Sequence, residues 1–129
     1  MFTIEQVKEA HSKVKSGADF PKYIQDLIRL GVMSYEVFVE DGRANYYGEN
    51  NYKVSAGAKY ETIKVASTSD IESFKTVLKE HQQGKSDYLA FCKMAADFGV
   101  EKWKLSMKDM TCTYFEKSGE ELLYESIPA

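Results

Sequence analysis

The chain has 129 residues, of which 43% are hydrophobic and 29% are charged, and its formal net charge is −3. This length fits a single domain over residues 1–129 that buries about two-thirds of the surface of its unfolded chain, and the composition excludes intrinsic disorder. The sequence has no basic cluster to bind nucleic acid and no apolar run of about 20 residues to form a membrane helix, which favours a cytoplasmic protein.

Two helices are predicted at the start of the chain. The first begins after Thr3, whose side chain can form a capping box with Gln6. The second follows Asp19, has Pro21 in its first turn and ends at Gly31, since glycine readily adopts the left-handed conformation of a helix terminus. Apolar residues recur at helical spacing in both segments, so each helix should bury one face.

A β-hairpin is predicted next. Apolar and polar residues alternate over residues 33–39, and Asp41-Gly42 suits a two-residue type I′ turn. This turn would place Val37 opposite Tyr46. The apolar face of the hairpin then comprises Met33, Tyr35, Val37, Val39, Ala44 and Tyr46.

Two further short strands are predicted at residues 52–55 and 60–65. The pattern of the first half then restarts. Ser69 and Glu72 can form a second capping box at the start of a third helix, which should end at Gly84.

A fourth helix is predicted from about Ser86 or Asp87 to Gly99. Because methionine disfavours positive φ, Asp109-Met110 should form a different loop from Asp41-Gly42. Both aspartates are interpreted as turn residues rather than as paired catalytic carboxylates. The strands expected after the fourth helix cover residues 100–107, 110–115 and 121–127.

The two halves of the sequence align with each other at a nearly constant offset, which pairs Gly31 with Gly99 and Tyr46 with Tyr114. This predicts an internal duplication with pseudo-repeats at about residues 1–66 and 67–129. The expected fold class is therefore α+β, with two ααβββ units that form an antiparallel sheet and pack four helices on one of its faces.

Histidines and cysteines give no enzyme signature. His11 and His81 lie on apolar helical stripes, where packing explains them better than a role as general base. Cys92 and Cys112 lack CxxC spacing and a neighbouring histidine, which indicates buried, reduced thiols rather than a nucleophile or a zinc site. No phosphate loop, GxSxG or HExxH motif occurs. We therefore predict no catalytic residue, no metal and no cofactor, and the chain is not expected to be an enzyme.

Aromatic residues are the most suggestive feature, since the predicted strands carry the single tryptophan and most of the nine tyrosines. Tyr35, Tyr46, Trp103 and Tyr114 share the side of the sheet that should face the helices. They can pack as core residues, or they can line a small-molecule groove at the seam between the two halves.

Three other aromatic residues, Phe38, Tyr47 and Phe115, should project from the opposite face among polar neighbours. If this face is uncovered, they mark a protein interface. The first hypothesis is therefore a non-enzymatic interaction module that binds a protein partner or forms a homodimer. The alternative is a small-molecule-binding protein, or a modest enzyme, that uses the aromatic groove.

Four segments carry a resemblance to a known family: HSKVKSGADFP at residues 11–21, HQQGK at 81–85, the segment at 88–97, and MTCTY at 110–114. Over residues 2–128 the chain resembles a family of uncharacterised bacterial and prophage proteins that are often labelled phage envelope proteins. The resemblance covers nearly the whole chain. It implies no catalytic or binding residue, because none is established in that family.

Overall fold

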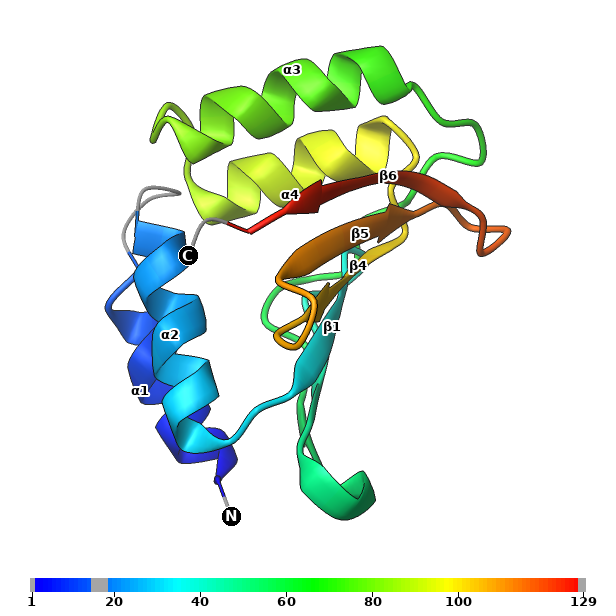
Figure 1. The fold of residues 1–129 in the computed structure, drawn as a ribbon. Coiled ribbons are helices and arrows are strands. Elements are labelled where there is room, and N and C mark those ends of the chain that lie inside the picture. Colours follow the sequence, from blue (N-terminus) through cyan, green and yellow to red (C-terminus); the bar gives the residue numbers. More distant parts are fainter. Residues whose placement is uncertain (1, 15–18, 128–129) are drawn as a thin grey trace.

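The computed structural model describes residues 2–14 and 19–127. In them, four helices cover one face of a six-stranded antiparallel sheet, so the expected α+β class is confirmed (Figure 1). The helices are α1 (Ile4–Ser12), α2 (Phe20–Leu30), α3 (Ile71–Gln82) and α4 (Tyr88–Asp97), with a short 3₁₀ helix η2 (Glu49–Asn51). The strands are β1 (Ser34–Phe38), β2 (Ala44–Tyr47), β3 (Lys53–Ala56), β4 (Lys102–Ser106), β5 (Thr111–Phe115) and β6 (Glu121–Ser126).

The first two helices begin and end at the predicted local signals. The Thr3 N–H donates to Gln6 Oε1 at 2.8 Å, and the Gln6 N–H donates to Thr3 Oγ1 at 3.2 Å, which completes the capping box of α1. Pro21 lies in the first turn of α2, and Gly31 ends that helix with φ at 101°. Local chemistry is therefore sufficient to set these boundaries.

The cap predicted for the third helix was wrong by one residue. Asp70, not Ser69, caps α3, because its carboxylate accepts the Ser73 N–H at 3.1 Å. The fourth helix begins where it was expected, since Asp87 caps α4 and accepts the Ala90 N–H at 2.7 Å.

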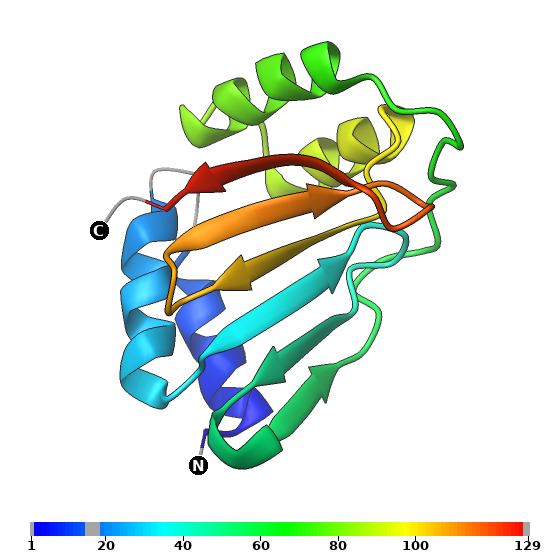
Figure 2. The ribbon, with the colours of Figure 1, turned by 45° about the vertical axis from the view of Figure 1, so that its right-hand side comes forward.

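The sheet has the strand order β3-β2-β1-β4-β5-β6, so the two halves of the chain meet at the antiparallel pair β1 and β4 (Figure 2). In this pair Tyr35 lies opposite Leu105 and Val37 lies opposite Trp103. Each half contributes two helices followed by three strands. A common origin of the two halves stays a prediction.

The predicted register of the first hairpin was wrong by two residues. Tyr35, rather than Val37, pairs with Tyr46, because the loop spans residues 39–42 instead of two residues. A shift of two preserves the face on which each side chain lies, so the predicted apolar face survives. Met33 is the exception, since it precedes β1 and is exposed.

The second hairpin uses the same loop length as the first, contrary to prediction. Ser106 pairs with Thr111 across a loop at residues 107–110. Met110 adopts φ of 52° where Gly42 has 78°, although a left-handed conformation costs a non-glycine residue roughly 1–2 kcal/mol. The surrounding sheet therefore overrides the local preference of Met110.

The strand predicted at residues 60–65 does not form. This segment instead connects β3 to α3 and packs against the end of the first hairpin. The Tyr60 hydroxyl donates to the Val39 carbonyl oxygen at 2.6 Å, and Val65 is buried.

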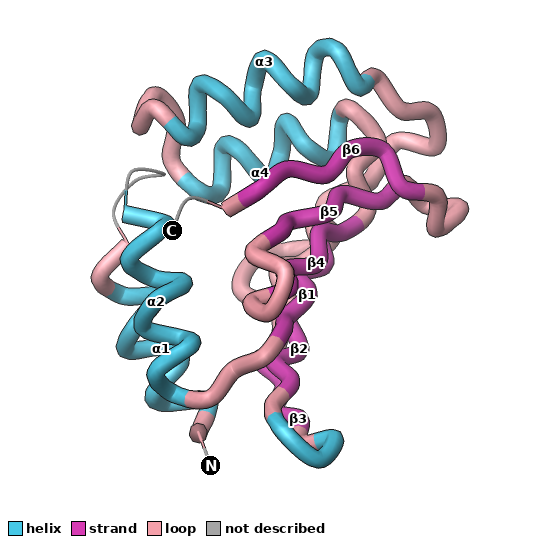
Figure 3. The backbone as a smooth tube through the Cα atoms, viewed as in Figure 1, coloured by secondary structure: helices cyan, strands magenta, loops and turns pink. Residues whose placement is uncertain are grey.

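The helices approach the sheet as two pairs, α1 with α2 and α3 with α4, set at a wide angle to each other (Figure 3). Contacts between aromatic rings connect both helix pairs to the sheet. The ring centres of Tyr23 in α2 and Tyr35 lie 6.3 Å apart, and those of Phe74 in α3 and Tyr114 lie 5.0 Å apart. Within the described ranges, no helix has the length and apolar character needed to cross a membrane.

Candidate functional site

A cavity of about 160 Å³ lies between the sheet and the two helix pairs. Every helix contributes to its wall: His11 from α1, Tyr23 from α2, His81 from α3 and Tyr88 from α4. The cavity is therefore built where both halves of the chain meet, as the small-molecule hypothesis required.

The floor of the cavity consists of two rows of side chains that cross the sheet. They lie on one side because alternate residues of a strand share a face. One row is Tyr46, Tyr35, Leu105, Cys112 and Glu125. The other row is Val37, Trp103 and Tyr114.

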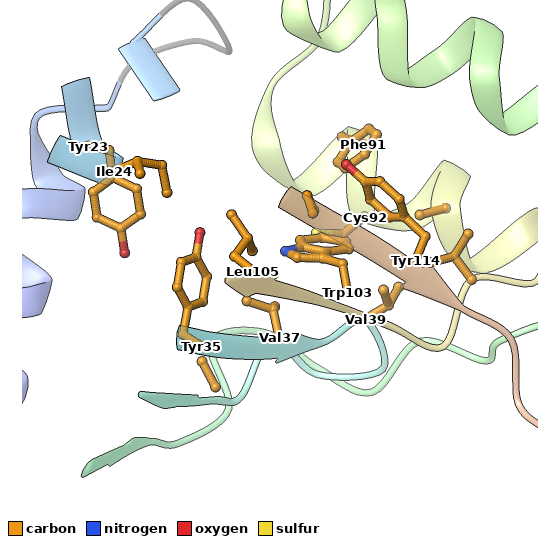
Figure 4. Packing of buried hydrophobic residues seen from close by; sticks show 14 of the residues in the cluster. Tyr23, Ile24, Tyr35, Val37, Val39, Phe91, Cys92, Trp103, Leu105 and Tyr114 are labelled. Carbon is orange, nitrogen blue, oxygen red and sulfur yellow. The ribbon is translucent and has the colours of Figure 1, made fainter. Parts of the chain in front are cut away.

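The four aromatic residues predicted to form a groove all line this one cavity. The rings of Tyr35 and Tyr46 stack at 5.2 Å, and those of Trp103 and Tyr114 lie 6.2 Å apart. Figure 4 shows Tyr35 and Trp103 projecting from the sheet, with Tyr23 of α2 near Tyr35 and Phe91 of α4 near Trp103. Ligand binding by these residues stays a prediction.

The Tyr35 hydroxyl and the Trp103 indole N–H are two of the polar groups on the cavity wall that have no hydrogen-bond partner in the described part of the chain. Neither the Tyr35 hydroxyl nor the Trp103 indole N–H makes a hydrogen bond there, although the residues are only 3% and 7% exposed. Among the described residues, every polar side-chain atom without accessible surface has a hydrogen-bond partner. These two unpaired groups therefore keep some accessible surface, and they expose it to the cavity that their residues line. Because buried polar groups are normally paired, these two can be satisfied by a bound molecule or by water.

The tyrosine hydroxyls around the cavity remain protonated. Burial raises the pKa of Tyr35 well above its usual value, and the neighbouring Tyr23 and Tyr46 hydroxyls add to this effect. The pKa of Tyr88 is raised in the same way, mainly by burial. Neutral hydroxyls both donate and accept, so they can bind polar groups of either kind.

His81 presents a neutral ring to the cavity. Its Nδ1 lies 3.1 Å from the Ser86 carbonyl oxygen, which can only accept, so Nδ1 carries the proton and Nε2 keeps a lone pair. The ring stacks on Phe91 at 4.3 Å. Burial lowers the pKa of His81, although the hydrogen bond to the Ser86 carbonyl oxygen and the charge of Asp87 each raise it in part.

Glu125 provides a carboxyl group on the side of the edge strand β6. Its Oε1 accepts a hydrogen bond from Gln82 Nε2 at 2.8 Å and one from the Tyr114 hydroxyl at 3.3 Å. Burial raises the pKa of Glu125, whereas these two hydrogen bonds lower it. The carboxyl group is therefore already engaged by its neighbours.

Lys59 follows β3, the opposite edge strand, and lines the cavity together with His11 and Tyr88. These three residues also line a wider hollow beside α4, so they mark a mouth of the cavity. Burial and the charge of Lys59 lower the pKa of His11. Loss of hydration lowers the pKa of Lys59, and the charge of Lys8 contributes in the same direction.

The residues of this site that sequence reasoning missed include Lys59, Tyr88 and Glu125. A signal existed for Glu125, because strand alternation places it on the same side as Leu123, which faces the helices. Lys59 lies in a segment without a periodic pattern, so nothing in the sequence pointed to its position.

The opposite face of the sheet carries Phe38, Tyr47 and Phe115, as predicted, and none of the described helices covers it (Figure 2). Cationic side chains lie over these rings, however. The Arg43 guanidinium is 4.3 Å from the centre of Phe38, and Lys102 Nζ is 5.4 Å from the centre of Phe115. The rings are consequently half-buried by their own neighbours. A homodimer or protein partner on this face stays a prediction.

Cys92 and Cys112 are buried and unpaired, as predicted. Burial raises the pKa of both thiols, that of Cys112 to about 12, which disfavours a role as nucleophile. Over residues 2–14 and 19–127, no group of three or more His, Cys, Asp or Glu residues is placed to hold a metal ion.

Comparison with known proteins identifies the family and no function. A search of curated proteins finds no match. A family model described as "Protein of unknown function (DUF1398)" matches residues 8–126, which run from α1 to the end of β6. The resemblance to an uncharacterised family is confirmed at this level, whereas the phage envelope label and the prophage link stay predictions. The chain therefore belongs to the DUF1398 family of proteins of unknown function.

Proposed function

We propose that this protein binds a small molecule with an aromatic ring in the cavity between its two halves. The observation that carries the proposal is the pair of unpaired donors, the Tyr35 hydroxyl and the Trp103 N–H, which open on an otherwise largely apolar cavity. Ligand sites typically combine apolar walls with a few polar groups of this kind.

The size and the walls of the cavity favour a single ring. Its volume of about 160 Å³ is close to the roughly 150 Å³ at which an apolar protein cavity accommodates benzene. The rings of Tyr35, Trp103 and Tyr114 offer both faces and edges to an aromatic ligand.

The remaining expectations add context to this proposal. Binding without catalysis is favoured, because the buried thiols have raised pKa values. A cytoplasmic location is compatible with two unpaired cysteines, since thiols stay reduced there. Self-association through the face that carries Phe38 and Phe115 is the less favoured alternative, because the cations over these rings reduce the apolar area that it could bury.

A fluorescence titration tests the proposed function. Trp103 is the only tryptophan, so a ring that enters the cavity changes its emission. With benzyl alcohol as the probe we expect a saturable change and a rise in melting temperature. A matched variant, Val37→Phe, fills part of the cavity and should lose both responses while it remains folded.

The titrations of the wild type and of Val37→Phe can also contradict the proposed function. If benzyl alcohol produces no saturable change, or if Val37→Phe responds as the wild type does, the cavity is not the binding site. Circular dichroism of the variant shows whether its fold is retained.

A further inference from the structure

We infer that the ligand is a small aromatic carboxylate, with its ring in the cavity and its carboxylate against Lys59. This inference rests on the proposed function and assigns the chemical class and the orientation of the ligand.

The two charged residues that line the cavity, Lys59 and Glu125, differ in their partners. Lys59 follows the edge strand β3 and Glu125 lies on the edge strand β6, so the two charges enter from opposite edges of the sheet. Oε1 of Glu125 already accepts from Gln82 and Tyr114. Within residues 2–14 and 19–127, no ion pair includes Lys59. Glu125 forms no ion pair in these ranges either, because both of its donors are neutral, but its carboxylate has two hydrogen-bond partners and the Lys59 ammonium group has none there. The charged group of the cavity that lacks a partner is therefore the ammonium group.

The surroundings of that ammonium group disfavour its charge. Lys59 is an exposed residue at the mouth, and it lines both hollows together with His11 and Tyr88. Partial loss of hydration and the charge of Lys8 both lower the pKa of Lys59. A ligand carboxylate would raise the pKa of Lys59 again for two reasons. Its charge-assisted hydrogen bond would replace the lost hydration of the ammonium group, and its negative charge would offset the positive charge of Lys8.

The cavity wall also carries uncharged donors. An indole N–H can only donate, and the unpaired Tyr35 hydroxyl is free to donate. Together with Lys59 these groups give the cavity three donors without a partner, which can bind acceptor atoms of a ligand, whereas His81 Nε2 is an acceptor. An aromatic amine would bring its cation towards Lys59 or would compete with partners that Glu125 already has.

The test compares three probes of nearly equal size at neutral pH: benzoate, benzyl alcohol and benzylamine. Trp103 emission measures each dissociation constant. We expect the wild type to bind benzoate about tenfold or more tightly than benzyl alcohol, because hydrogen bonds to charged groups are the stronger ones. Benzylamine should bind most weakly.

Two lysine variants locate the carboxylate. Lys59→Met keeps the length of the side chain but removes its charge, so benzoate should bind no better than benzyl alcohol, whose own affinity should be unchanged. Lys64→Met is the control, because Lys64 is exposed and lines neither hollow. It should behave as the wild type does.

The outcomes separate this inference from the proposed function. If all three probes bind equally, or if Lys59→Met retains the preference for benzoate, the inference is overturned while ring binding stands. If benzylamine binds most tightly, Glu125 rather than Lys59 selects the ligand. If no probe binds, the proposed function fails as well.

Discussion

The hydroxyl groups of Tyr60 and Tyr35 differ in their hydrogen bonding within the protein. The Tyr60 hydroxyl donates to the Val39 carbonyl oxygen at 2.6 Å, whereas the Tyr35 hydroxyl has no partner in the described part of the protein. Removal of a hydrogen-bonded hydroxyl leaves a carbonyl oxygen without its donor, which costs about 1 kcal/mol.

We therefore predict that Tyr60→Phe lowers the free energy of unfolding by about 1 kcal/mol and that Tyr35→Phe changes it by less than about 0.5 kcal/mol. Urea denaturation of both variants beside the wild type measures the difference. Equal losses in the two variants would show that the Tyr35 hydroxyl is also engaged in the unliganded protein.

The histidines of the cavity should make stability depend on pH. Burial lowers the pKa of His11 and His81 from 6.5, so the unfolded chain binds protons more readily than the folded protein. The stability that they contribute is present above pH 6.5 and is lost as pH falls through their folded-state pKa values. The raised pKa of Glu125 acts in the opposite direction.

The double variant His11→Gln/His81→Gln should thus lose less stability than the wild type when the pH falls from about 7.5 to about 5.5. Unfolding midpoints in urea at several pH values measure this. Glu125 is present in both proteins and cannot produce the difference. Identical pH profiles would contradict the burial of these two rings.

Individual elements were predictable where their ends depend on local chemistry. The capping box of Thr3 and the glycine stop at Gly31 lie where the sequence placed them, because the donors, acceptors and φ values are local. The hairpin register and the segment at residues 60–65 were wrong, because tertiary packing decides both. Met110 at φ of 52° illustrates this, since its own preference opposes the loop that it forms.

The junction between α4 and β4 gives a test at this scale. Gly99 has φ of 83°, and a Cβ atom there would lie 2.5 Å from the Thr68 carbonyl oxygen. We expect Gly99→Ala to lower the free energy of unfolding by roughly 1–3 kcal/mol. Gly57→Ala is the matched control, because no atom lies within 4 Å of a Cβ atom at Gly57. Thermal unfolding of both variants measures the contrast, and a stable Gly99→Ala would contradict this tight junction.

For the molecule as a whole, the sequence predicted the layers, the inward aromatic face and, as one alternative, a groove at the seam between the halves, but not the shape of the cavity or its charged residues. Alternation in the strands was enough to place Tyr35 and Trp103 on the helix-facing side. The cavity depends on the angle between the two helix pairs and on the pairing of β1 with β4, and both arise from contacts between distant parts of the chain. The position of Lys59 depends on the same contacts.

The open face of the sheet offers a second test of the whole molecule. Because Arg43 and Lys102 lie over Phe38 and Phe115, we expect little apolar surface for a dimer. Wild type and the Tyr47→Ser/Phe115→Ser variant should sediment alike as monomers. A concentration-dependent dimer that the variant loses would instead establish the interface predicted from the sequence.

The most direct test of ligand binding between the two halves is a methyl NMR titration with benzoate. The predicted result is a set of shifts in methyl groups that line the cavity, among them those of Val37, Leu78 and Leu105, while the methyl signals of Val65 and Val100 do not shift. Shifts that leave the cavity methyl groups unchanged, or no shifts at all, would contradict a binding site at this position.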